Sequence, residues 1–326
     1  MNIGLIGFGG VGKDFIKLLK YKDLNYKIIF ILKSNGGIFN KNGLDIDEII
    51  SMEDSLNNHK DWQEKNSLEE LYSNIDLLIE LTPTNKENGE PALSYIKTAL
   101  NNGISVVTGN KGPILHGYRE LTRIAKSKNC FLGVGCTTGG ALPTISGGLF
   151  DCRGAEIISI EGILNGTSNY ILKEMEDNDL SYSEALEKAR NQGIAERDQA
   201  LDVEGYDTAI KMLILANVLM GSSLKLEDVS IKGIKNIKKK EIQLAKEKGK
   251  RIKLIGRIYK ENSNIKITVM PEAVNKNHPL YNVEGKNKGI TYYTDTLGEI
   301  TISGGASGTR NAAAAILRDI LNYSRG

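Results

Sequence analysis

A carboxylate and an amine, Asp207 and Lys211, lie four residues apart in a stretch from Tyr206 to Met220 that carries no other charge. The apolar composition on every side predicts a buried helix, and the spacing puts both charges on one of its faces. Taking such groups out of water costs several kcal/mol. The pair is therefore a candidate for proton exchange with a substrate oxygen, and a buried structural ion pair is the alternative reading.

A glycine-rich segment, GFGGVG, follows a strand predicted over residues 2–6 and precedes a predicted helix. Gly7 permits the tight turn, Gly9 lets the backbone approach a pyrophosphate, and Gly12 lets helix and strand pack closely. The helix N-terminus would hold the anion. The segment predicts dinucleotide binding, with contacts from Gly7, Gly9, Gly10, Val11 and Gly12.

The residue at the end of the second predicted strand is Lys33, about 20 residues past the last glycine, where folds that prefer NAD place an acid. A cation there can pair with a 2′-phosphate, so NADP is the preferred prediction for the cofactor. A solvated lysine at the end of a strand, and with it NAD, is the alternative.

The first part of the chain alternates between strands and helices, which predicts an α/β fold with a Rossmann-type, doubly wound parallel sheet. Strands are predicted over 27–32, 75–81, 104–108 and 130–134, and helices over 90–101 and 118–127. Thr82 and Lys111 follow two of these strands. Ligands bind at such carboxyl ends.

The pattern changes after Gly139 and predicts a second, mixed α/β domain. Strands are expected over 156–163, 265–270 and 299–303, and helices from Asn165, over 183–192, over 206–220 and over 312–323. Thr167 or Ser168 is expected to cap the helix that begins near Asn165. The predicted domains are 1–135 with 304–326 for the dinucleotide, and 136–303 for the substrate.

The bulk composition excludes some classes of partner. The formal net charge is +2, which argues for neither nucleic acid nor a membrane surface, and no apolar run reaches the ~20 residues of a spanning helix. Three cysteines and no signal-peptide pattern favour a cytoplasmic protein. The basic run 232–253 is interpreted as a solvated helix face above Ile234, Ile237, Ile242 and Leu244.

Seven segments together resemble the short, single-activity homoserine dehydrogenases over nearly the whole chain. They are GFGGVG at Gly7, ELTPTN at Glu80, VVTGNKGP at Val106, GILNGTSNYIL at Gly162, GIAERDQALDVEGYDTAIK at Gly193, HPL at His278 and GGASG at Gly304. The resemblance implies hydride transfer between NADP or NAD and the pair L-homoserine and L-aspartate 4-semialdehyde, in threonine and methionine biosynthesis. It also implies a homodimer, with the second domain as the dimerisation domain.

The resemblance also implies a role for each matching residue. Lys211 matches the acid–base lysine, Asp207 orients it, and Lys111 lines the space for substrate and nicotinamide. Glu196 and Asp202 match acidic substrate-binding positions, and Gly166 and Thr167 would bind substrate through the backbone. Further cofactor contacts are expected from Thr82, Lys111 and Gly308.

The chain departs from the family pattern at two places. Ile194 stands where a tyrosine is usual, and Gly135 stands where a glutamate of a monovalent-cation site is often found. A sodium site is therefore expected only through the backbone of Thr138, Gly140 and Leu142. No regulatory domain is expected after the last helix.

Two other functions are weighed against this one. A semialdehyde dehydrogenase would use Cys136 as its nucleophile, but it needs an activating histidine, and His59, His116 and His278 lie in no partner motif. A non-catalytic NADP-binding sensor would use Asp207 and Lys211 only to hold a helix.

Overall fold

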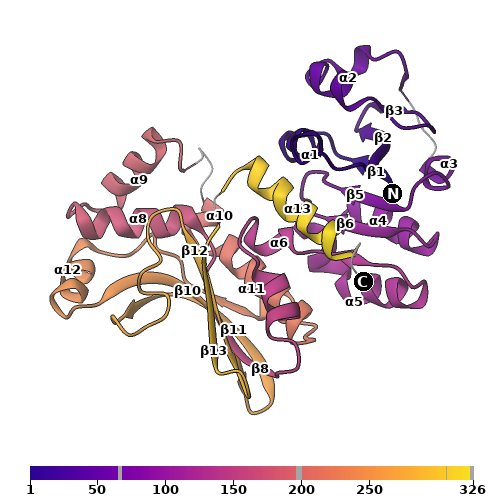
Figure 1. The fold of residues 1–326 in the computed structure, drawn as a ribbon. Coiled ribbons are helices and arrows are strands. Elements are labelled where there is room, and N and C mark those ends of the chain that lie inside the picture. Colours follow the sequence, from indigo (N-terminus) through magenta and orange to yellow (C-terminus); the bar gives the residue numbers. More distant parts are fainter. Residues whose placement is uncertain (65–67, 196–199, 306, 324–326) are drawn as a thin grey trace. The chain divides into compact units, whose positions relative to one another are not determined.

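The computed structural model describes residues 1–64, 68–195, 200–305 and 307–323. The chain forms two compact units (Figure 1). The first unit consists of residues 1–141 and 308–326, and the second consists of residues 142–307.

The first unit is built on a seven-stranded sheet in the order β4-β3-β2-β1-β5-β6-β7. Its strands are β1 (Asn2–Ile6), β2 (Lys27–Lys33), β3 (Gly36–Phe39), β4 (Trp62–Gln63), β5 (Leu77–Glu80), β6 (Ser105–Thr108) and β7 (Leu132–Gly133). The strands from β2 to β7 in this order pair in parallel, which confirms the predicted Rossmann-type α/β fold.

The edge formed by β3 and β4 is antiparallel and was not predicted. Gly36 and Gly37 are the first two residues of β3, and glycine is depleted in strands. In the structure they allow a close strand approach, because a Cβ on Gly37 would collide with the carbonyl oxygen of Ile31. Glycine marks close backbone contact in such strands.

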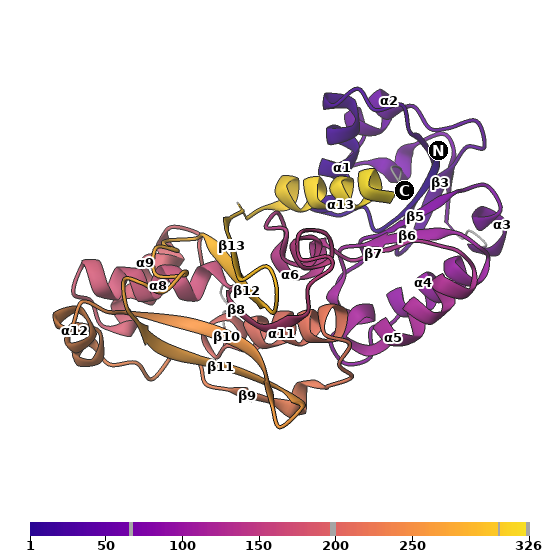
Figure 2. The same ribbon diagram turned by 60° about the horizontal axis from the view of Figure 1, so that its bottom comes forward.

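Helices cover both faces of this sheet (Figure 2). The longer ones are α1 (Gly10–Tyr21), α4 (Ala92–Asn101), α5 (Lys111–Ser127) and α13 (Thr309–Tyr323), and the shorter ones are α2 (Ile46–Ser51), η1 (Leu56–Asn58), α3 (Leu68–Tyr72) and α6 (Cys136–Gly139). α1 packs against α13, and α4 packs against α5. Phe15 and Leu19 of α1 share one core cluster with Ile316 and Ile320 of α13.

Helix α5 begins at Lys111, well before the predicted start at Tyr118. The side chain of Asn110 accepts the N–H of Gly112 and caps the helix. Pro113 then falls in the first turn, where its missing N–H costs nothing. The predicted start at Tyr118 was therefore seven residues too late.

The second unit is built on a six-stranded sheet in the order β13-β12-β8-β10-β11-β9. Its strands are β8 (Ile157–Ile163), β9 (Val229–Ile231), β10 (Arg251–Glu261), β11 (Asn264–Val274), β12 (Lys288–Thr294) and β13 (Glu299–Gly304). All pairs are antiparallel except β9 with β11. Strands β9, β10 and β12 were not predicted.

The basic run 232–253 is mostly not helical, contrary to the sequence interpretation. Only α12 (Lys239–Glu247) is a helix, and β10 begins at Arg251. Ile234, Ile237 and Ile242 are buried as expected, but Leu244 is 43 % exposed. Leu244 follows the buried Ile242 by two residues, which places it about 200° around the helix, on the solvent side.

Several helices of the second unit contact its sheet. They are α7 (Thr144–Ser146), the π-helical turn η2 (Gly147–Asp151), α8 (Gly166–Asp177), α9 (Tyr182–Asn191), α10 (Ala200–Val203), α11 (Tyr206–Leu219), η3 (Leu226–Asp228) and α12. α11 is the predicted apolar helix, and it packs on β10 and β11. A Cβ on Gly256 of β10 would lie 2.5 Å from Met212 Cγ of α11, so glycine lets helix and strand approach.

Across the described ranges, no helix combines the length and apolar character needed to cross a bilayer.

Candidate active site

The ion pair of α11 is formed as the spacing predicted. Lys211 Nζ lies 2.6 Å from Asp207 Oδ2 and donates a second hydrogen bond, 2.7 Å long, to the carbonyl oxygen of Leu164. The two side chains are 14 % and 15 % exposed, respectively. An ammonium held by a carboxylate and a carbonyl, and still reached by solvent, has a fixed position and can exchange a proton.

Asn165 connects this pair to a second carboxylate. Its Nδ2 donates to Asp202 Oδ1 at 2.7 Å and to Asp207 Oδ2 at 3.0 Å, and its Oδ1 accepts the N–H of Ser168 at 2.8 Å. Asn165 is therefore the N-cap of α8, so the expected cap at Thr167 or Ser168 was wrong. Asparagine competes well for this position because its side-chain oxygen reaches the first-turn amides.

The first turn of α8 lies beside these side chains. Gly166 and Thr167 are its first residues, and no acidic residue stands in this turn. Thr167 Oγ1 donates to the carbonyl oxygen of Ile194 at 3.3 Å. Helix N-termini present amide hydrogens and a positive dipole end to anions. The arrangement can thus receive a carboxylate next to the Lys211–Asp207 pair.

The structure brings most of the predicted residues of the second unit together. Lys211, Asp207, Asp202, Gly166 and Thr167 all belong to this group, which Asn165 links. Glu196 lies outside the described residues. Sequence reasoning did not name Asn165 as a site residue, although its place directly before the Gly166 helix was a usable signal.

The glycine turn of the first unit has the geometry that a pyrophosphate requires. Gly7 has φ +99°, and a Cβ on Gly12 would lie 2.5 Å from the Gly7 carbonyl oxygen. Gly9, in contrast, has nothing within 4 Å of its Cβ position. No side chain caps α1, which starts at Gly10. The residues present therefore fit a dinucleotide, because the open backbone lies at an uncapped helix N-terminus.

A buried acid ties Thr82 to the start of α5. Glu80 Oε1 accepts the N–H of Thr82 at 2.7 Å, Glu80 Oε2 accepts the Thr108 hydroxyl at 2.8 Å, and Asn110 Nδ2 donates to the Thr82 carbonyl at 3.1 Å. Burial raises the pKa of Glu80, and the bonds from Thr82 and Thr108 oppose this. Lys111 follows Asn110 directly, so Thr82 and Lys111 are held at the same edge of the sheet.

The expected cofactor residues Lys33 and Gly308 lie at two further places in the first unit. Lys33 ends β2, next to the glycine turn, since the N–H of Gly7 bonds to the Leu32 carbonyl at 2.9 Å. Gly308 precedes α13 and has φ +130°. Thr309 follows it, and a Cβ on Gly10 would lie 2.7 Å from the Thr309 methyl.

A carboxylate that the sequence did not indicate shares the Lys33 corner. Asp54 Oδ1 lies 2.5 Å from Lys13 Nζ. The hydrogen bond with Lys13 holds the pKa of Asp54 below its usual value, and the charges of Lys13, Lys17 and Lys33 add to this. Glu53, whose Oε2 lies 2.7 Å from Lys17 Nζ, is a second acid here, so the corner holds acids as well as cations.

Thr138 and Gly140 of the expected sodium site belong to the first unit, and Leu142 belongs to the second. Among the described residues, no cluster of His, Cys, Asp and Glu side chains could hold a metal ion. The backbone cation site stays a prediction.

Cys136 does not have the surroundings of a catalytic thiol. Its Sγ lies 3.6 Å from the Ala312 carbonyl oxygen. His116 Nε2 lies 2.7 Å from the Lys86 carbonyl, and His278 Nε2 lies 3.0 Å from Glu161. These partners give no support to a Cys–His pair.

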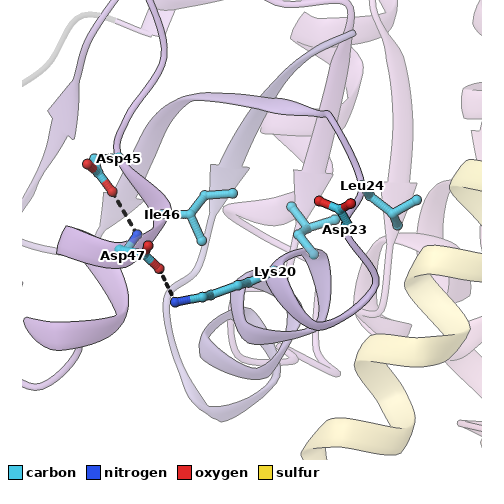
Figure 3. A pocket seen from close by; sticks show the side chains of 7 residues that line it. Lys20, Asp23, Leu24, Asp45, Ile46 and Asp47 are labelled. Carbon is cyan, nitrogen blue, oxygen red and sulfur yellow. Dashed lines mark hydrogen bonds and ion pairs between the residues drawn. The ribbon is translucent and has the colours of Figure 1, made fainter.

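A polar pocket between α1 and α2 lies elsewhere on the first unit (Figure 3). It is lined by Leu19, Lys20, Asp23, Leu24, Asp45, Ile46 and Asp47. Lys20 pairs with Asp47, and Asp45 caps α2. None of the predicted site residues lines it.

Comparison with known proteins gives one consistent family. Residues 7–134 match the model for the NAD-binding domain of homoserine dehydrogenase, and residues 143–321 match the model for homoserine dehydrogenase. A homoserine dehydrogenase from Methanocaldococcus jannaschii is 37 % identical over 99 % of this chain and 98 % of its own length. An NAD(+)-dependent homoserine dehydrogenase from Pseudomonas canavaninivorans is 34 % identical over 98 % and 95 %.

A solved structure from Archaeoglobus fulgidus that carries the homoserine dehydrogenase name superposes with a TM-score of 0.89. It is 33 % identical, and the match covers 99 % of both chains.

The fold and the matches to family models and named relatives together define a nicotinamide-dependent oxidoreductase that acts on a CH–OH group. The polar site of the second unit is consistent with this class. The chain belongs to the homoserine dehydrogenase family. Its reaction interconverts L-homoserine and L-aspartate 4-semialdehyde, a step of amino-acid biosynthesis.

Proposed function

We propose that Lys211 is the acid–base residue of this homoserine dehydrogenase. The observation that carries the proposal is the position of its ammonium, which Asp207 and the Leu164 carbonyl hold from two sides. In homoserine oxidation the neutral amine form of Lys211 accepts the hydroxyl proton and becomes the ammonium, and in semialdehyde reduction the ammonium form donates a proton to the same oxygen. A bound nicotinamide supplies the hydride acceptor or donor.

The amino-acid end of the substrate needs groups of both signs. The carboxylates of Asp202, Asp207 and Glu196 suit its ammonium group. The amides of Gly166 and Thr167 at the start of α8 suit its carboxylate. Binding of the ammonium and carboxylate groups of the substrate would hold the reacting carbon beside Lys211.

The first unit is proposed to bind the cofactor through Gly7, Gly9, Gly10, Val11, Gly12, Lys33, Thr82, Lys111 and Gly308. Lys111 is proposed to contact both cofactor and substrate, and the second unit to bind substrate and to form a homodimer. A monovalent cation at the backbone of Thr138, Gly140 and Leu142, and a cytoplasmic location, complete the proposal.

NADP is the proposed preferred cofactor, and NAD is the alternative. Lys33 and Lys13 offer cations for a 2′-phosphate next to the glycine turn. Asp54, which pairs with Lys13, opposes this by offering a carboxylate for a free 2′-hydroxyl. The relative from Pseudomonas canavaninivorans is described as NAD(+)-dependent. We propose that the balance between the two lysines and Asp54 decides whether this chain prefers NADP or NAD.

The Lys33→Asp variant tests the cofactor proposal. It replaces a cation by an acid that repels a 2′-phosphate and accepts a 2′-hydroxyl, so kcat/KM should shift toward NAD by about tenfold or more. The measurement is steady-state kinetics with each cofactor at saturating homoserine. An unchanged NADP-to-NAD ratio would remove Lys33 from the cofactor site, and Lys41→Asp is the control for a general charge effect.

The proposed function itself is tested by following reduction of NADP and NAD on addition of L-homoserine, with L-serine and L-threonine as controls. Turnover that requires homoserine is expected. A folded protein that binds either cofactor and oxidises none of these alcohols would contradict it.

A further inference from the structure

A buried lysine lies in the second unit, and the proposed reaction does not use it. Lys253, near the start of β10, is 2 % exposed. Its Nζ donates to the Val283 carbonyl oxygen at 2.6 Å and to Asn169 Oδ1 at 3.2 Å. Desolvating an ammonium is costly, and an apolar side chain of the same length would fill the space without that cost. The lysine therefore needs an explanation other than packing.

Asn169, the main side-chain partner of Lys253, is 1 % exposed and lies on α8, one turn after the cap Asn165. Its Nδ2 donates to the carbonyl oxygens of Val283 at 3.1 Å, Gly285 at 3.0 Å and Asn287 at 3.4 Å. Lys253 and Asn169 thus hold the segment 283–287 by its backbone. Because backbone carbonyls are the acceptors, the two side chains fix the path of the segment whatever its own side chains are.

The held segment passes over the first turn of α8. A Cβ on Gly166 would lie 2.8 Å from the Lys286 carbonyl oxygen, so this carbonyl covers the Gly166 backbone. Apolar packing also anchors the Val283 end of the segment, since Leu280 and Val283 pack with Ile163 and Ile255 in one apolar cluster. A shift of the segment would therefore change the space above the proposed carboxylate-binding turn.

We propose that Lys253, acting through Asn169, is a positioning residue that holds the segment 283–287 over Gly166 and so sets the affinity for homoserine. The inference rests on the proposed function, because it takes the first turn of α8 as the place where the substrate carboxylate binds. Lys253 touches neither substrate nor cofactor in this account.

Charged groups from three elements face the Lys253 ammonium. They are Glu176 and Lys173 of α8, Arg251 of its own strand, and Glu284 of the held segment. Burial lowers the pKa of Lys253 to about 8, the charges of Glu176 and Glu284 oppose this, and those of Arg251 and Lys173 add to it. The lysine is charged through the neutral range, so its bond to the Val283 carbonyl is a charge-assisted one there.

The test compares Lys253→Met, Asn169→Ala and the exposed-lysine control Lys250→Met with the wild-type enzyme. Thermal unfolding, the dissociation constant for the cofactor, and KM and kcat for homoserine are measured for each. Lys253→Met and Asn169→Ala should raise KM for homoserine by roughly three- to tenfold. Cofactor affinity and kcat should stay within about twofold of wild type, and Lys250→Met should match wild type throughout.

An unchanged KM for homoserine in both stable variants would overturn the positioning role. Loss of folding in both would also overturn it, because the two side chains would then be structural. Wild-type turnover of homoserine is measured in the same series, so failure of the proposed function is seen separately from failure of this inference.

Discussion

At the scale of single residues, Asn165 connects the groups of the site, although it neither accepts nor donates the reacting proton. Asn165 uses one end of its amide to cap α8 and the other to hold Asp202 and Asp207. Asp207 in turn holds Lys211. The orientation of the amide is determined by this environment, since only its oxygen can accept from Ser168 and only its nitrogen can donate to carboxylates.

The Asn165→Ser variant separates these two roles. Serine caps helices about as well as asparagine, but it is too short to reach both carboxylates. Unfolding should therefore change little, while kcat/KM for homoserine should fall by about tenfold or more, since a hydrogen bond to a charged group contributes about 1.5–3 kcal/mol. Steady-state kinetics and thermal unfolding measure the two effects. Equal activity to wild type, or a loss of activity that only follows lost stability, would contradict the assignment.

At the scale of elements, the glycines of the turn between β1 and α1 have different structural roles. Gly12 is a packing residue, because its Cβ position is blocked by the Gly7 carbonyl, and Gly9 is open. The same distinction holds in the second unit, where Gly256 lets α11 approach β10 and Gly166 lies under the Lys286 carbonyl. Gly12, Gly166 and Gly256 are thus sites of close packing, whereas Gly9 leaves space for a ligand.

A pair of alanine variants tests this division of duties. Gly9→Ala should keep the stability of the wild type and weaken cofactor binding by tenfold or more, because the methyl group enters the space left for the pyrophosphate. Gly12→Ala should destabilise the first unit by about 1–3 kcal/mol through overpacking. Fluorescence titration with the cofactor and urea unfolding give the two values. The reverse pattern would show that the turn does not bind a pyrophosphate at Gly9.

Elements could be predicted from the sequence where the local hydrophobic pattern agrees with the burial of the element in the fold. The apolar strands of the first unit and helix α11 are examples. Strand β10 was missed because its lysines and arginines read as a solvated face, whereas Lys253 is buried against α8 and the segment 283–287. Strand β3 was missed because its glycines serve close strand pairing.

The candidate site was predicted from motifs more than from geometry. Lys211 and Asp207 follow from helical spacing alone. Asn165 and Asp202 are 37 residues apart, and Glu80 and Thr108 are 28 residues apart. Their contacts depend on how distant elements pack, and no local pattern reports that.

At the scale of the whole molecule, each unit contains a buried ionisable group that the proposed reaction does not use. In the first unit it is Asp319 of α13, which is 4 % exposed and accepts the N–H of Gly135 at 2.7 Å. Burial raises the pKa of Asp319 to about 6, and the bond from Gly135 and the charge of Arg318 oppose this. The C-terminal helix is thereby tied to the turn that follows β7.

The raised pKa of Asp319 makes stability depend on pH. Because the folded-state pKa exceeds the unfolded value, the stabilising contribution is fully present below about pH 4 and is lost as pH rises through 6. Asp319→Asn keeps an acceptor for Gly135 and avoids the buried charge. The difference in free energy of unfolding between Asp319→Asn and wild type should therefore change in favour of the variant between about pH 4 and 7, by on the order of 2–3 kcal/mol.

Urea unfolding at several pH values measures this difference, with the exposed Asp23→Asn as the control. A gap between Asp319→Asn and wild type that does not change with pH would contradict the account of Asp319.

The most direct test of the central claim is the turnover of L-homoserine by Lys211→Ala, with and without an added small primary amine such as ethylamine. We expect kcat to fall by about 10²–10⁴-fold, the range that general acid–base groups contribute. Cofactor affinity should be retained, the added amine should restore part of the rate, and Lys240→Ala on the surface of α12 should behave as wild type. Turnover by Lys211→Ala within a few-fold of wild type would contradict the assignment of Lys211 as the acid–base residue.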